Sequence, residues 1–343
     1  MVNKRNWFSL IILSVSIGIM VFVLAGCTSP TGKDPQASLE GLSSTTPAEI
    51  SEDPFKSTTV ETEGGGTLTV VSSPSPDQVE ESGEVERSTP APIATFDPNK
   101  WQDLPVIPVV SEGAREIYIH GLSLGNDPHA FAKVGDCQNV PSMFLSIFEH
   151  EGFYSLREED ARLEETIQWF EGSFSRESEA VRRGFNAASV VSPLWANPAS
   201  CDPGETPLDC EIRLHQPSIA LVSLETWWEG DPDKYEQYVR EILETLIDRG
   251  ILPVLATKAD NLEGDHRINK ILVRLAYEYD IPLWNYWRVI QSLPNQGLME
   301  DGFHLTFAEN HFDDPEAMMA AWPWRNLTAL QVLNSVWQGV SAP

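Results

Sequence analysis

Two short stretches far apart in this sequence carry residue types that together suit acyl transfer. Gly135-Asp136-Cys137 follows the apolar run Phe131–Val134, a pattern typical of a strand that enters a tight turn. The turn would present the Cys137 thiol at the carboxyl end of a strand, where α/β sheets bind ligands. A helix expected after the turn would direct its positive end at the sulfur and favour the thiolate, the form that attacks. Asp301 and His304, near the other end, are types that orient and perform general-base catalysis.

These stretches resemble two sequence blocks of the SGNH (GDSL-type) hydrolases. Gly135-Asp136-Cys137 is similar to the first block, Gly-Asp-Ser, with Cys in place of Ser, and Asp301-Gly302-Phe303-His304 matches the last block, Asp-x-x-His. The resemblance covers roughly Gln102 to Gly339. It implies an α/β fold, a three-layer α/β/α sandwich with a parallel sheet (the flavodoxin-like SGNH hydrolase fold). It also implies that Cys137 is the nucleophile, His304 the base and Asp301 the orienting acid. The alternatives are an inert, buried Cys137 and an N-capping Asp301 beside a solvent-exposed His304.

The resemblance also implies donors for the oxyanion of acyl transfer. We expect the backbone N–H groups of Cys137 and of Gly184, a candidate for the glycine of the second block, to serve as donors. An ordinary helix-capping role is the alternative for Gly184. The third block departs from the family pattern, because Glu225-Thr226-Trp227-Trp228 stands where the family has Gly-x-Asn-Asp. The oxyanion Asn is therefore missing from its usual place, and Asn186 is a candidate substitute.

Trp227 and Trp228 follow the strand that is expected at Pro217–Leu224. One interpretation is an aromatic shelf beside the site that packs on sugar rings of a substrate, and the other is that both side chains belong to the core or its rim. Lys258 and Asp260 follow the next expected strand, and either contact substrate or pair with each other in a surface loop. The histidines show no metal-ligand spacing, so we expect neither a metal nor a cofactor.

The N-terminal residues 1–27 have the pattern of a bacterial lipoprotein signal peptide. Lys4 and Arg5 precede an apolar run, Phe8–Val23, and Leu24-Ala25-Gly26-Cys27 resembles a lipobox whose cysteine is acylated. An uncleaved signal anchor is the alternative. Residues 28–100 are rich in Ser, Thr, Pro, Gly and Glu, which indicates a disordered acidic tether. Residues 101–343 are long enough for one α/β domain. We therefore expect a protein lipid-anchored to the cell membrane and facing the extracellular side.

Charge and cysteine usage limit the function further. The formal net charge is −28, which argues against nucleic acid and anionic lipid headgroups as partners. Cys201 and Cys210 flank a loop-like stretch in an exported chain, so we expect a disulfide between them. With Cys27 lipidated, Cys137 is then the odd cysteine, a candidate reactive thiol.

Hydrophobic periodicity predicts alternating strands and helices, which favours a parallel sheet covered on both faces. Trp101–Val110 reads as a strap over the fold, and Arg115–Leu124 as a helical turn or edge strand. The expected strands beyond the first are Pro217–Leu224, Ile251–Ala256 and Ile281–Trp284. The expected helices are one through Met143–Phe148, Arg157–Phe170, one that opens at Asp231-Pro232 and closes at Gly250, Asp265–Tyr279 and Trp324–Trp337.

These observations predict an esterase that acts on small acyl groups, with carbohydrate esters as the natural class. Its only membrane contact would be the N-terminal lipid, and we expect a monomer. The rival interpretation is a weak or inactive module on a hydrolase fold that binds glycans or another surface ligand, since Cys replaces Ser and the oxyanion Asn is absent. A cell-surface anchor without a ligand is a third interpretation.

Overall fold

A four-stranded parallel sheet forms the centre of the described chain. The computed structural model describes residues 98–224 and 230–342. The strand order is β1-β3-β4-β5, with bounds β1 Asp127–Gly135, β3 Pro217–Ser223, β4 Leu252–Ala256 and β5 Leu283–Trp284. A second, two-stranded parallel sheet pairs β2 (Tyr154–Ser155) with β6 (Asn310–His311). The expectation of an α/β fold with a parallel sheet is confirmed.

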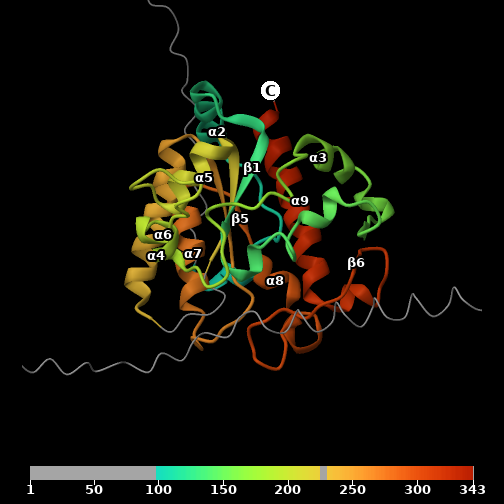
Figure 1. The fold of residues 1–343 in the computed structure, drawn as a ribbon. Coiled ribbons are helices and arrows are strands. Elements are labelled where there is room, and N and C mark those ends of the chain that lie inside the picture. Colours follow the sequence, from blue (N-terminus) through green and yellow to red (C-terminus); the bar gives the residue numbers. More distant parts are fainter. Residues whose placement is uncertain (1–97, 225–229, 343) are drawn as a thin grey trace, which may run out of the picture. The chain divides into compact units, whose positions relative to one another are not determined.

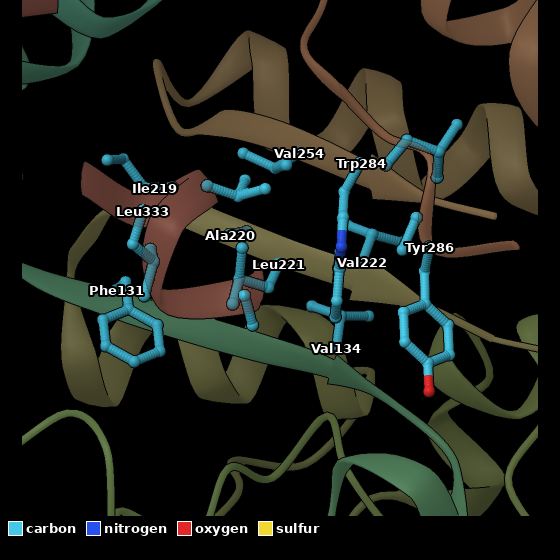
Figure 2. Close-up of a cluster of buried hydrophobic side chains, with 14 of the residues drawn as sticks. Phe131, Val134, Ile219, Ala220, Leu221, Val222, Val254, Trp284, Tyr286 and Leu333 are labelled. Atoms are coloured by element: carbon cyan, nitrogen blue, oxygen red, sulfur yellow. The ribbon is translucent and has the colours of Figure 1, made fainter. Parts of the chain in front are cut away.

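The central strands are buried along most of their length, as their continuous apolar runs predict. In β3 every residue except the last is buried, and β4 is buried throughout. The sheet is in register where its strands end, since Val134 pairs with Val222 and Val222 with Leu255. Figure 2 shows Val134 and Val222 in the cluster that also contains Phe131 and Leu333 of the C-terminal helix. The carboxyl ends of the strands therefore meet at one edge of the sheet.

Helices cover both faces of the sheet (Figure 1). One group contains α4 (Ala187–Val190), α5 (Pro207–His215), α6 (Pro232–Asp248) and α7 (Arg267–Glu278). On the other side lie α3 (Leu163–Trp169) and the long helix α9 (Ala321–Ser341), while α8 (Tyr286–Ile290) follows β5 and contacts α9. The segment before β1 forms α2 (Glu112–Leu124), which decides between the two interpretations of that stretch in favour of helix.

Local sequence signals set several boundaries correctly. Asp231 caps α6, because its carboxylate accepts a hydrogen bond from the Asp233 amide, and Pro232 occupies the first turn. The strap at Trp101–Val110 also forms, and the Asn285 side chain donates to the backbone carbonyls of Trp101 and Leu104. Residues 98–100, which the sequence assigned to the tether, instead begin the 3₁₀ turn Pro98–Asp103.

The helix predicted through Met143–Phe148 is wrong. Cys137–Asn139 form only a 3₁₀ turn, and turns lead from there to a second one at Ser146–Glu149. Leu145 has a left-handed backbone, and its amide donates to Oδ1 of Asn326 on α9 at 2.7 Å. Asn326 Nδ2 donates in turn to the Met143 carbonyl. Asn326 of α9 thus hydrogen-bonds the backbone of this segment. Since 3₁₀ turns take the place of the predicted helix, that helix and its dipole are absent beside Cys137.

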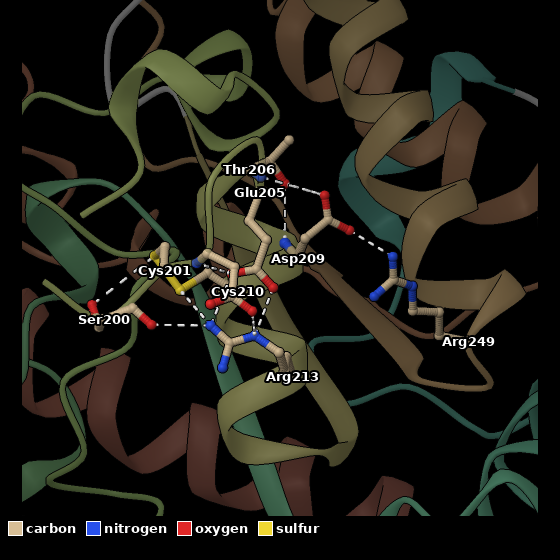
Figure 3. Close-up of polar contacts among 9 residues, drawn as sticks. Ser200, Cys201, Glu205, Thr206, Asp209, Cys210, Arg213 and Arg249 are labelled. Atoms are coloured by element: carbon tan, nitrogen blue, oxygen red, sulfur yellow. Dashed lines mark hydrogen bonds and ion pairs between the residues drawn. A yellow bond between two sulfur atoms is a disulfide. The ribbon is translucent and has the colours of Figure 1, made fainter. Parts of the chain in front are cut away.

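The predicted disulfide between Cys201 and Cys210 is confirmed. It joins a surface loop to α5, and Figure 3 shows Arg213 and Glu205 packed beside it, paired at 2.6 Å. Cys201, Glu205 and Cys210 are also the one group of potential metal ligands that lie close together within residues 98–224 and 230–342, and their two sulfurs are bonded to each other. In the same part of the chain, none of the helices combines the length and the apolar character that crossing a bilayer requires.

Candidate functional site

The site begins where β1 ends, at Gly135. This residue pairs with Ser223 of β3 on one side and forms a parallel bridge with Val181 on the other. The Gly135 amide donates to the Ala180 carbonyl at 3.0 Å, and the Arg182 amide donates to the Gly135 carbonyl at 3.4 Å. The chain that leaves β1 is therefore held on both sides directly before Cys137.

Residue 135 must be a glycine because the side chain of Asn139 lies very close to its Cα. A Cβ at this position would lie 2.7 Å from Cβ of Asn139 and closer still to its amide. Asn139 is fully buried, and its Nδ2 donates to the Ser223 carbonyl at 2.7 Å. The amide of Asn139 thus ties the turn to the end of β3, and only glycine leaves room for it.

Asp136 and Cys137 form the start of the 3₁₀ turn. The buried Asp136 carboxylate accepts a hydrogen bond from the Gln138 amide at 2.9 Å, which caps the turn. Cys137 comes next, is partly exposed and forms no disulfide. The sulfur therefore stands at the carboxyl edge of the sheet, the edge at which α/β folds bind ligands.

Asp301 and His304 form the second half of the site. Asp301 Oδ2 lies 2.6 Å from His304 Nδ1, while Oδ1 accepts from the amides of Phe303 and His304 at 3.1 and 3.0 Å. Partial burial raises the pKa of Asp301, but these hydrogen bonds from His304 and Phe303 outweigh it and hold the pKa below its usual value. The ionised carboxylate fixes Nδ1 as the donor, so Nε2 is the nitrogen that would exchange a proton with a nucleophile.

The loop that carries this pair is tightly anchored. Gly302 has φ +80°, which permits the turn between Asp301 and His304. The Met299 amide donates to the His304 carbonyl at 2.8 Å, and Leu298 bridges to Leu305. Thr306 then accepts hydrogen bonds from the start of α9. These contacts let Asp and His three residues apart turn toward each other.

One contact joins the two halves. Gln138 Nε2 lies 3.5 Å from the Phe303 carbonyl oxygen. Gln138 directly follows Cys137, and Phe303 directly precedes His304. The residues predicted as nucleophile and base therefore lie on segments that touch, although 167 positions separate them in the sequence.

The candidate oxyanion donors lie on the segment that passes Gly135. Gly184 follows the Val181 bridge by three residues, is exposed, and has φ +83° with open space where a Cβ would stand. Asn186 caps α4, because its Oδ1 accepts from the amide and hydroxyl of Ser189, both at 2.9 Å. Asn186 also lines a pocket of about 440 Å³ together with Trp195 and others. Both candidates thus lie on the chain that leaves the same end of the sheet as Cys137.

Lys258 and Asp260 pair with each other, but they are buried rather than in a surface loop. Lys258 Nζ lies 2.7 Å from Asp260 Oδ1 and 2.6 Å from Glu263 Oε2. Burial raises the pKa of Asp260 to about 6, although the Lys258 charge opposes the shift. The loop lies beside the His304 loop, since a Cβ on Gly302 would contact Leu262. This buried ion cluster supports the edge of the site.

Sequence reasoning missed two supporting residues, Asn139 and Arg325. Arg325 lies on α9 with 1% of its surface exposed, and it donates to the carbonyl of Gln138 and the hydroxyl of Ser223. The Gly-Asp-Cys motif directs attention to the thiol and carries no signal for either. Of the predicted site residues, Cys27, Trp227 and Trp228 lie outside the described residues.

Comparison with known proteins adds no relative to this geometry. A scan against models of known protein families finds no match for this chain, and a search of curated proteins finds none with significant similarity.

Proposed function

We propose that this chain is a carboxylic ester hydrolase of the SGNH (GDSL-type) class with a cysteine nucleophile. The observation that carries the proposal is the contact between Asp301 and His304, 2.6 Å apart on a loop that touches the Cys137 turn through Gln138. A base oriented by a carboxylate and placed next to a nucleophile is the arrangement that acyl transfer needs.

In the proposed reaction, the sulfur of Cys137 attacks the ester carbonyl while Nε2 of His304 accepts the thiol proton. The tetrahedral oxyanion would be bound by backbone N–H groups of Cys137 and Gly184, with the Asn186 amide as a further candidate donor. His304 then gives its proton to the departing alkoxide, which leaves a thioester on Cys137. Water activated by His304 hydrolyses that thioester and restores the thiol. Asp301 stays ionised and stabilises the imidazolium.

The arrangement of the strands supports this class. The order β1-β3-β4-β5, with a further parallel bridge from Val181 on the free edge of β1, matches the flavodoxin-like order 2-1-3-4-5 if the Val181 segment counts as the second strand. Cys137 then follows the central first strand, at the point where the strand order reverses.

We further propose that the enzyme is a lipoprotein anchored through Cys27 at the cell surface, and that its substrates are small acyl esters of carbohydrates. The lipobox-like sequence before Cys27 motivates the location. Trp227-Trp228, which follow the end of β3 in the sequence after Leu224-Glu225-Thr226, motivate the choice of carbohydrate esters.

The test is hydrolysis by the full-length protein of p-nitrophenyl acetate, longer p-nitrophenyl esters and acetylated sugars. We expect activity on acetate esters that is lost in Cys137→Ala and in His304→Ala, with non-additive effects in the double variant because the two residues act as a unit. Cys137→Ser should keep or gain ester hydrolysis. His150→Ala, a change to an exposed histidine, is the matched control and should have no effect. Inertness of both the Cys and the Ser forms toward every ester would refute the proposal.

The second candidate is a glycan-binding module on the same fold. Two sequence observations favour it: Cys replaces Ser at the nucleophile, and Glu225-Thr226-Trp227-Trp228 lacks the oxyanion Asn. Loss of one oxyanion donor typically costs about a hundred- to a thousand-fold in rate. Glycan binding by a protein whose Cys and Ser forms are both inert would establish this candidate instead.

A further inference from the structure

Arg325 of α9 is a buried cation enclosed by aromatic rings. Its Cζ lies 4.7 Å from the ring centroid of Phe144, 5.1 Å from that of Tyr286 and 5.2 Å from that of Trp284. Figure 2 shows Trp284 and Tyr286 in the packed core at the end of the sheet where Val134 lies. The faces of aromatic rings attract a guanidinium, and the attraction is strongest where water is excluded.

The guanidinium donates its hydrogen bonds to oxygens around the Cys137 turn. Nε donates to the Gln138 carbonyl at 3.3 Å, and Nη2 to Ser223 Oγ at 3.0 Å and to Asn139 Oδ1 at 3.4 Å. All three acceptors are formally neutral. Because a buried charge is costly without a counter-charge, this cation favours negative charge nearby.

Asp136 and Cys137, on the turn itself, are two groups that can carry such a charge. Burial lowers the pKa of Arg325, and Tyr286, Asp136 and Cys137 act in the opposite direction when they are ionised. Burial keeps the Tyr286 phenol neutral by raising its pKa, which leaves Asp136 and Cys137 as the groups that can be charged near neutral pH. The interaction is reciprocal, so a charged Arg325 favours the thiolate of Cys137. An arginine side chain keeps its proton in proteins, which makes this charge permanent.

We propose that Arg325 is a positioning residue that fixes the Cys137 turn from within the core and favours the thiolate form of Cys137. In this proposal the Arg325 charge has the effect that the sequence analysis expected from a helix dipole, which is to favour the thiolate. The inference rests on the proposed nucleophilic role of Cys137, but its test does not require that an ester be hydrolysed.

The test is the pH dependence of alkylation of Cys137 by iodoacetamide in the full-length protein, quantified by mass spectrometry of the peptide that contains Cys137. The thiol pKa should lie below the ordinary value of about 8.5. Because Asp136 lies next to the thiol, and His304 with Asp301 on the neighbouring loop, the titration is repeated in His304→Ala. There the pKa should still be below 8.5, and 1 M NaCl should leave it unchanged, since buried charges are weakly screened.

Substitution of Arg325 separates its charge from its packing. Arg325→Gln should raise the thiol pKa by about one unit, which slows alkylation at pH 7 about tenfold. Arg325→Lys keeps a charge and should have a smaller effect. Arg288→Gln is the matched control, because Arg288 also donates to backbone carbonyls, those of Asp103 and Leu104, and its replacement should leave the thiol pKa unchanged.

Two results would overturn the inference: a thiol pKa at or above 8.5 in the His304→Ala protein, or a folded Arg325→Gln protein with an unshifted thiol pKa. The thiol pKa of the His304→Ala protein tests the inference even if Arg325→Gln does not fold. An inactive protein with a lowered thiol pKa would refute the esterase and leave the role of Arg325 standing. An active esterase with an ordinary thiol pKa would support the esterase and refute the role of Arg325.

Discussion

Replacement of Gly135 by Ala should destabilise the protein strongly, although the change adds a single methyl group. The added Cβ would lie 2.7 Å from Cβ of Asn139 and nearer to its amide, so Asn139 must move. That movement breaks the hydrogen bond from Asn139 Nδ2 to the Ser223 carbonyl. Loss of a buried hydrogen bond costs about 1–3 kcal/mol, and overpacking adds about 1–3 kcal/mol. Together these contributions predict a loss of about 2–6 kcal/mol in unfolding free energy.

The assay is urea and thermal unfolding of wild type, Gly135→Ala, Asn139→Gly and the double variant. In a domain of this size, each kcal/mol lowers Tm by about 2–4 °C, so Gly135→Ala alone should lower it by about 4–24 °C. Asn139→Gly removes all three atoms nearest the new Cβ, and in that background Gly135→Ala should cost less than about 1 kcal/mol. An equal cost of Gly135→Ala in both backgrounds would show that Asn139 is not the reason for the glycine.

Three further substitutions address the acid, the anchor and the buried ion cluster. Asp301→Asn should reduce ester hydrolysis at least about a hundred-fold, with a change in Tm of only a few degrees, because the amide oxygen still accepts the backbone hydrogen bonds; a small rate effect would contradict its orienting role. Cys27→Ala should move the protein from the membrane to the soluble fraction, and retention would indicate a signal anchor. Burial holds the pKa of Asp260 at about 6, so the native state binds a proton that the unfolded chain has lost between about pH 4 and 6. The stability of wild type relative to Asp260→Asn should therefore fall as the pH rises through that range, by up to about 3 kcal/mol, and parallel pH profiles of unfolding would rule this out.

Local signals predicted the elements whose determinants are local. The apolar run at Pro217–Leu224 indicated a buried strand, and β3 spans Pro217–Ser223. Asp231-Pro232 indicated a helix start because the cap and the proline act within one turn, and α6 begins there. Cys201 and Cys210 lie nine residues apart and form the expected disulfide. In each case the sequence window contains the interacting groups.

The helix predicted after Cys137 failed because the competing interaction is distant. The Met143 carbonyl and the Leu145 amide form hydrogen bonds with the side chain of Asn326, 183 and 181 residues away. The apolar residues at helical spacing are still largely buried, so the pattern predicted their burial correctly. It predicted the backbone conformation incorrectly. Periodicity of this kind does not distinguish a helix from turns whose polar groups are satisfied by another element.

The residues that surround Cys137 could not be predicted from the sequence for the same reason. Gln138 and Arg325 are 187 positions apart, and the three rings around Arg325 come from the turn before Ser146, from β5 and from α8. In the sequence, Arg325 is the one charged residue between Ala321 and Ser341, and exposure is the default expectation for a charged side chain. Only the packing of α9 against the carboxyl edge of the sheet brings its guanidinium to the carbonyl of Gln138, the residue after Cys137. A motif can therefore indicate a candidate nucleophile, whereas the groups that we propose to set its ionisation come together only in the complete fold.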